Sequence, residues 1–218
     1  MVVNNQHLIK MKKLFLFILG LIFIVGCSSS KKLTEYSFSN KESSLIMMAD
    51  TLTPMRVFKI TDKNDSLLLR TKSSYVKVNP KDIVLQTLVK RLYATVTDSM
   101  SLGAGIATPQ VGILQNIILV QRFDKEDLPF EVFLNPKIVK YSEQKQTVKE
   151  GCLSIPNRRE TLNSRSLTVN IEYDTIQAEH KTETVEGFTS VIFQHEIDHL
   201  NGILYLDHLA KEVRDTQN

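Results

Sequence analysis

The sequence predicts an α+β fold, in which strands occupy the middle of the chain and helices lie toward both ends. Three observations lead to this prediction. Residues 83–96 carry apolar side chains at three- and four-residue intervals, as an amphipathic helix does. Residues 169–173 alternate apolar with polar side chains, as a half-buried strand does. From Thr189 the apolar spacing is helical again, so strands and helices do not simply alternate along the chain.

Short apolar runs predict the strands, and turn residues predict where elements begin and end. The expected strands lie at residues 55–60, 117–120, 132–134, 169–173 and 203–206, with 182–186 as a partner for 169–173. Asn79 or Asp82 lies near the expected start of the first helix. Gly103 and Gly105 interrupt the pattern after that helix, and Gly202 is expected to end the last one.

The composition fits one globular domain with a short additional segment. The 218 residues are 42% hydrophobic and 23% charged, and the formal net charge is +3. The basic residues are scattered, with Lys31-Lys32 and Arg158-Arg159 as the densest pairs. Nucleic-acid binding requires a basic face. We therefore expect no nucleic-acid partner, and we expect a monomer.

The first 26 residues differ in composition from the rest of the chain. Three lysines precede an apolar run at residues 14–25, and Cys27 follows it. This run is too short to cross a bilayer as a helix, but it has the length of the apolar part of a secretory signal. The tetrapeptide IVGC at residues 24–27 resembles the lipobox of bacterial lipoproteins, whose cysteine receives the lipid.

A plan of three segments follows from this pattern. We expect a lipoprotein signal peptide at residues 1–26, a polar tether at 27–52 and the folded domain at 53–218. The lipid on Cys27 would then anchor an exported protein to a bacterial membrane, on its periplasmic side. A buried core helix is the alternative interpretation of the apolar run. Either Met1 or Met11 can be the start, and the choice of inner or outer membrane is open.

The sequence QHEIDH at residues 194–199 carries the clearest chemistry. On a helix, His195 and His199 lie one turn apart on one face, so both imidazoles can bind the same metal ion. Glu196 lies about 100° around the helix and can accept a proton from an attacking water. The same spacing also fits a surface helix with two histidines and two acids.

Cys152 is a candidate for the third metal ligand. Cys27 and Cys152 are the only cysteines, so a lipidated Cys27 leaves Cys152 unpaired. A thiolate with two imidazoles leaves one coordination position open for water, which a catalytic metal site needs. A small buried apolar residue is the alternative role of a lone cysteine. Downstream of the two histidines, Asp207 and His208 are the other residues with ligand chemistry.

Three segments together resemble the peptide deformylase family. The sequence GAGIATPQ at residues 103–110 is similar to the family's GxGhAAPQ motif, where h is aliphatic. The sequences EGCLS at 150–154 and QHEIDH at 194–199 are similar to its EGCLS and QHExDH motifs. The motifs occur in the family's order, and the resemblance covers about residues 53–207. Thr108 replaces the family's alanine, and we expect it to perturb packing rather than chemistry.

The resemblance implies a single deformylase-like domain, with antiparallel or mixed sheets around a central metal-binding helix. It implies an enzyme that removes the formyl group from the N-terminal formyl-methionine of peptides and releases formate. Cys152, His195 and His199 would bind one divalent metal ion. Fe(II) is the expected ion, and zinc or nickel are alternatives.

The remaining site roles come from the same resemblance. Glu196 would take a proton from water and deliver it to the leaving amine. The side-chain amide of Gln110 and the backbone N–H of Leu153 would stabilise the oxyanion. Gly105 would let the substrate backbone approach closely.

Two further interpretations concern residues around this site. Asp198 can hydrogen-bond a ligand imidazole, can pair with Arg165, or can be an ordinary helix-surface carboxylate. Val191 and Ile192 can line the pocket for the methionine side chain or can belong to the core. His208 carries no motif and is given no role.

Two other functions compete with deformylation. One is a membrane-anchored zinc endopeptidase, and Cys152 within EGCLS argues against it. The other is a lipoprotein that binds formylated peptides without catalysis, and the intact set of motif residues argues against that. The exported location leaves the physiological substrate open, because deformylation normally acts on nascent chains in the cytoplasm.

Overall fold

A computed structural model describes residues 38–99 and 103–217 of the chain. The strands β1 (Gly105–Ala107), β2 (Ile117–Gln121), β3 (Phe130–Tyr141), β6 (Thr168–Asp174) and β7 (His180–Glu186) form one sheet in the order β1-β2-β3-β6-β7. All its neighbouring strands are antiparallel. A second sheet is the hairpin of β4 (Lys145–Cys152) and β5 (Ile155–Ser166). The α+β prediction is confirmed.

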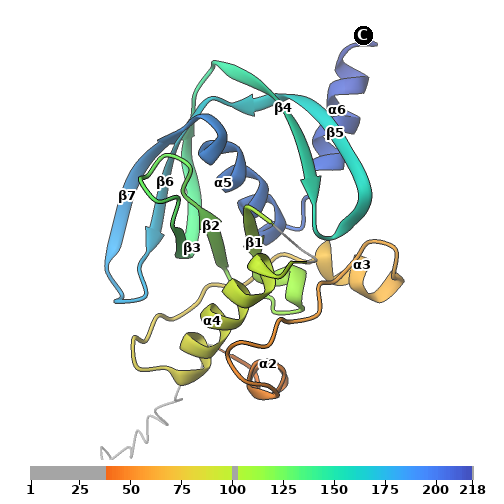
Figure 1. The fold of residues 1–218 in the computed structure, drawn as a ribbon. Helices are drawn as coiled ribbons and strands as arrows, with labels where there is room; N and C mark the ends of the chain where they lie inside the picture. The colour runs from red at the N-terminus through yellow and green to blue at the C-terminus, as the bar shows by residue number, and fades with distance from the viewer. Residues whose placement is uncertain (1–37, 100–102, 218) are drawn as a thin grey trace, which may run out of the picture. The chain divides into compact units, whose positions relative to one another are not determined.

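The helices flank these sheets. They are α2 (Asn40–Met47), α3 (Lys63–Leu69), α4 (Ile83–Thr97), α5 (Gly187–Leu200) and α6 (Tyr205–Asp215), with a 3-10 turn, η1, at Thr108–Val111. Figure 1 shows α5 in the middle of the domain, between the five-stranded sheet and the β4–β5 hairpin. None of the described helices combines the length and the apolar character that crossing a bilayer requires.

Helix α4 begins and packs as its sequence predicts. The side chain of Asp82 caps it by accepting hydrogen bonds from the backbone N–H groups of Val84 and Leu85. Leu85, Leu88 and Leu92 on its inner face are fully buried in a core cluster that includes residues of β1 and β2.

Helix α2 belongs to the folded domain, so this domain begins before residue 52, where the tether was predicted to end. Ser39 and Glu42 form a capping box at its start. Phe38 and Ile46 are buried in the same core cluster as α4. Arg91 of α4 donates hydrogen bonds to the backbone carbonyls of Leu45 and Ile46 and so ties α2 down. Residues 1–37, with the predicted signal peptide and the rest of the tether, lie outside the described residues.

Two predicted strands are wrong. Residues 55–59 have no regular secondary structure and Ile60 lies in a turn. The N–H of Phe58 donates to the carbonyl of Gln110 and that of Ile60 to the carbonyl of Ser154, so these residues pair with loop and turn residues rather than with a strand. Residues 203–206 lead into α6, because Asp207 accepts a hydrogen bond from the N–H of Leu204 and closes the first turn of a helix. A short apolar run does not by itself distinguish a strand from a helix start.

Helix α5 is held against the five-stranded sheet by one face. Phe193, Ile197 and Leu200 pack into a second core cluster with residues of β2, β3, β6 and β7. The ring of Phe193 lies edge-to-face against Phe133 of β3, with centroids 4.7 Å apart. The opposite face of the helix is therefore free to carry polar side chains toward the β4–β5 hairpin.

Candidate active site

Cys152, His195 and His199 come together as one group. The two histidines lie one turn apart on α5, and Cys152 ends β4 on the facing hairpin. The sulfur of Cys152 lies 3.2 Å from Nε2 of His199. The three candidate ligand atoms all lie within 4.8 Å of one another. Ligands bound tetrahedrally at about 2.0–2.3 Å lie roughly 3–4 Å apart, so this donor set fits one divalent ion.

Glu150 fixes the orientation of the His195 ring. Its Oε2 lies 2.7 Å from Nδ1 of His195. An ionised carboxylate only accepts, so Nδ1 carries the hydrogen and Nε2 is left to bind a metal. Burial acts to raise the pKa of Glu150, but the hydrogen bonds from His195 and Arg165 outweigh it and lower this pKa to about 2. Glu150 is therefore ionised at neutral pH.

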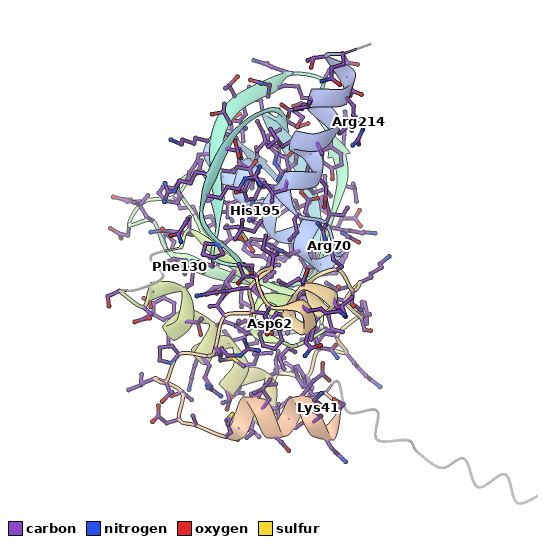
Figure 2. All side chains as sticks on the ribbon, turned by 90° about the vertical axis from the view of Figure 1, so that its right-hand side faces the viewer. Lys41, Asp62, Arg70, Phe130, His195 and Arg214 are labelled. Atoms are coloured by element: carbon purple, nitrogen blue, oxygen red, sulfur yellow. The ribbon has the colours of Figure 1, made fainter. Side chains whose placement is uncertain are left out.

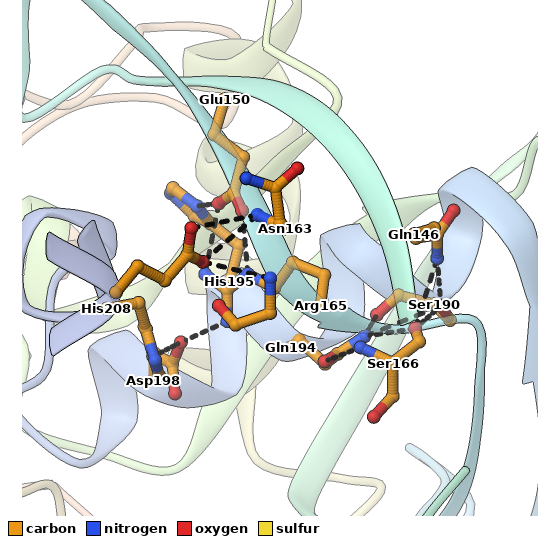
Figure 3. Close-up of polar contacts among 12 residues, drawn as sticks. Gln146, Glu150, Asn163, Arg165, Ser166, Ser190, Gln194, His195, Asp198 and His208 are labelled. Carbon is orange, nitrogen blue, oxygen red and sulfur yellow. Dashed lines mark hydrogen bonds and ion pairs between the residues drawn. The ribbon is translucent and has the colours of Figure 1, made fainter. Parts of the chain in front are cut away.

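Arg165 connects Glu150 to helix α5, as Figure 3 shows. Its Nε and Nη2 donate to the two oxygens of Glu150 at 2.7 and 3.0 Å. Its Nη1 donates to Oδ2 of Asp198 at 2.7 Å. Of the interpretations of Asp198, the pairing with Arg165 is the one found. Only 3% of the Arg165 side chain is exposed, so these charges are satisfied by each other rather than by water.

Glu196 follows the candidate ligand His195 on α5 and carries a buried carboxylate. The residue is 4% exposed, and its Oε2 has no hydrogen-bond partner among the described residues. Burial raises the pKa of Glu196 to about 7. A carboxyl group with this pKa can accept and return a proton near neutral pH.

Gly105 packs directly against Glu196. A Cβ at Gly105 would lie 2.7 Å from Oε1 of Glu196 and 2.8 Å from Cγ2 of Ile192. The contact between β1 and α5 therefore requires glycine at this position, independently of any contact with a substrate. Ile192 is 5% exposed and packs in the second core cluster. It is therefore a core residue, which is one of the two roles considered for it from the sequence.

Gln110 is the buried polar residue that η1 brings to the site. The N–H of Ala107 donates to its Oε1 at 2.9 Å, which fixes the direction of the amide. Its Nε2 then points toward Ser154, at 3.3 Å from Oγ, and toward Cys152, at 3.6 Å from the sulfur. Leu153 lies between those two residues, in the turn that joins β4 to β5.

Thr108 is accommodated at the position where the family motif has alanine. It is fully buried, and its hydroxyl donates to the backbone carbonyls of Gln115 and Ile117, at the entry to β2. The added hydroxyl is thus satisfied by the backbone, which is what a buried polar group needs.

Sequence reasoning missed an aromatic neighbour of the site. Tyr205 at the start of α6 stacks on the ring of His195, with centroids 5.9 Å apart, and is 1% exposed. Asp207 and His208, the other downstream candidates for ligands, pair instead with Arg70 and Asp198. The helix-start pattern Leu204–Asp207 was the one available signal for this region.

The comparisons with known proteins agree on one family. A sequence model described as polypeptide deformylase matches residues 56–215. The chain belongs to the peptide deformylase family. The peptide deformylase of Desulforudis audaxviator (strain MP104C) is 36% identical over 155 residues, which cover 70% of this chain and 94% of that protein.

Solved deformylase structures share the fold of this family member. A class I type b peptide deformylase from Acinetobacter baumannii with Met-Ala-Ser bound gives a TM-score of 0.64 at 32% identity, covering 72% of this chain and 98% of that one. The peptide deformylase from Thermotoga maritima gives 0.61 at 27% identity, covering 72% and 97%. The family resemblance, the fold and the enzyme class predicted from the sequence are confirmed.

Proposed function

We propose that this chain is a metal-dependent peptide deformylase, which hydrolyses the formyl group of N-terminal formyl-methionine and releases formate and a free amine. The observation that carries the proposal is the convergence of Cys152, His195, His199, Glu196 and Gln110 on one buried site. The family match supports this activity and gives no support to the endopeptidase or the non-catalytic alternative.

Cys152, His195 and His199 would hold the metal. A bound divalent ion would polarise the formyl carbonyl and make water nucleophilic at neutral pH. We propose Fe(II) as this ion, with zinc or nickel as alternatives, because one thiolate and two imidazoles suit all three.

Glu196 moves the proton in this proposal. Its free oxygen accepts a proton from the attacking water and delivers it to the leaving amine. A pKa of about 7 suits both transfers, since the same group must be a base in one step and an acid in the next.

Gln110 and Leu153 stabilise the negative charge that develops on the formyl oxygen. The amide of Gln110 is held by Ala107 with its N–H groups toward Cys152, so it needs no reorientation during the reaction. The backbone N–H of Leu153 is proposed as the second donor. The loss of one such donor costs about 3–4 kcal/mol of barrier.

Replacement of Glu196 tests the proposed activity. Glu196→Gln keeps the shape but cannot accept the proton, so we expect turnover of a formyl-methionyl peptide to fall at least about 100-fold. Metal content should remain at the wild-type level, whereas Cys152→Ser should lose most of the metal. An N-blocked peptide cleaved internally serves as the control substrate. Cleavage of that control by the wild type would favour the endopeptidase.

We further propose that the protein is exported and carries lipid at Cys27. The support is the order of three lysines, an apolar run and cysteine in residues 10–27. Residues 28–37 separate Cys27 from Phe38, and an extended stretch of that length reaches at most about 35 Å. The catalytic domain would therefore work close to a membrane, on formylated peptides present there.

Mass measurement and acyl labelling of the native protein test the anchor. Labelling should be abolished in Cys27→Ala, and a native protein that keeps Met1 or Met11 would contradict export. A chain that starts at Phe38 should keep deformylase activity, because it retains the capping box and the buried side chains of α2.

A further inference from the structure

His208 is linked to the metal group through four consecutive contacts. Its Nε2 lies 2.8 Å from Oδ2 of Asp198, which accepts from Arg165 at 2.7 Å. Arg165 donates to Glu150, and Oε2 of Glu150 lies 2.7 Å from Nδ1 of His195. These five side chains form one row of contacts, and Figure 3 labels all of them.

Two donors converge on one oxygen of Asp198. Both Nη1 of Arg165 and Nε2 of His208 lie within hydrogen-bond distance of Oδ2. Because an ionised carboxylate only accepts, Nε2 of His208 carries the hydrogen. With one donor from β5 and one from α6, the carboxylate cannot turn without losing a bond.

The outer end of this row is open to solvent. The His208 side chain is 30% exposed and that of Asp198 is 16% exposed, whereas Arg165 and Glu150 are 3% and 4% exposed. A cavity of about 170 Å³ lies beside them and is lined in part by Arg165, Asp198 and His208. If His208 were removed, water could reach Asp198, so the carboxylate would be solvated but less firmly oriented.

We propose that His208 is a positioning residue for the metal site. It holds the carboxylate of Asp198, which holds the guanidinium of Arg165. Arg165 in turn orients the carboxylate of Glu150 that sets the His195 ring. The inference rests on the proposed metal site and adds to it a residue of α6, which no motif marks.

The chain offers a matched control in His180 on β7. Its Nδ1 lies 2.8 Å from Oδ1 of Asp174, and the Asp174 side chain is 16% exposed, as that of Asp198 is. This pair has the same chemistry and length but no contact with the metal group among the described residues. His180→Ala therefore measures what the loss of a surface histidine–aspartate pair does by itself.

The experiment measures the rate at which a chelator removes zinc from the zinc-loaded full chain. A direct partner of a ligand histidine is worth about 10–100-fold in metal affinity. His208 is three contacts further out, so we expect His208→Ala to lose zinc about threefold to tenfold faster. Deformylase kcat/KM should fall by a factor similar to that by which the rate of zinc loss rises. His208→Gln, which keeps an N–H donor, should recover part of both, and His180→Ala should match the wild type.

Three outcomes would overturn the inference. The first is a zinc-loss rate for His208→Ala within twofold of that for His180→Ala. The second is a lowered Tm with no change in zinc loss, which would mark a merely structural role. The third is an effect of His208→Ala that persists in full in an Asp198→Asn background. A wild-type protein that holds no stoichiometric zinc would overturn the metal site as well, which separates the two failures.

Discussion

Two buried arginines, Arg122 and Arg165, contact helix α5 from different sides and differ in the groups to which they connect it. Arg122 pairs with Asp124, Glu131 and Glu183, and its guanidinium lies 5.8 Å from the ring centroid of Phe193 on α5. Arg165 pairs with Glu150 and with Asp198 of the same helix. The side chains of both arginines are 3% exposed or less.

The difference lies in where each set of contacts ends. The carboxylate partners of Arg122 are 27–33% exposed, so that cluster ends in solvent. The partner Glu150 of Arg165 is 4% exposed and contacts His195, a candidate metal ligand. A buried arginine with several carboxylates thus pairs with partly exposed side chains in one place and contacts the proposed metal site in the other. The last residues in each set of contacts decide which of these two roles the arginine has.

Loss of Arg165 should have the largest effect. Arg165→Met would leave Glu150 buried without its cation, and removal of one partner of a buried ion pair costs about 3–5 kcal/mol of stability. Urea unfolding measures this loss. Metal content should also fall, because Glu150 would no longer be held toward His195. A variant with wild-type metal content would remove the distinction between the two arginines.

Loss of Arg122 should lower the stability less than loss of Arg165 does, and it should not change metal binding. Arg122→Met would free three carboxylates that water already reaches, so we expect a loss of about 2 kcal/mol. Metal content and the rate of zinc removal should stay within about twofold of the wild type. A faster zinc loss would show that the Phe193 side of α5 also controls the site.

Acid should have the smallest effect, and it should destabilise both clusters. The pKa of Glu150 is about 2, against 4.5 for an ordinary glutamate, because the bonds from His195 and Arg165 outweigh burial. The Arg122 hydrogen bond likewise lowers the pKa of Asp124 to about 2. A lowered folded-state pKa adds stability above the unfolded value, and this stability is lost as pH falls toward the folded value.

The free energy of unfolding of chelator-treated protein should therefore decline from about pH 4.5 downward. Each carboxylate should account for on the order of 1–2 kcal/mol of this decline by pH 3. Glu150→Gln and Asp124→Asn should each flatten part of the slope, and only Glu150→Gln should weaken metal binding. Equal slopes for Glu150→Gln and the wild type would contradict the assigned ionisation.

The sequence by itself determined the local parts of this protein. Helical spacing placed His195, His199 and Glu196 on α5, because residues four apart on a helix share a face whatever surrounds it. Asp82 marked the start of α4 by the same kind of short-range chemistry. Three short motifs also led to the family that the comparisons confirm.

Only the tertiary structure decided which distant residues complete the site. Glu150 meets His195 across 45 positions, Arg165 meets Asp198 across 33, and His208 meets Asp198 from the next helix. The folding of residues 38–52 onto α4 depends likewise on two buried side chains and on Arg91. Sequence spacing encodes contacts within one element. The partners of a buried charge depend on how sheets and helices pack, because an ion leaves water only where the fold supplies its counterions.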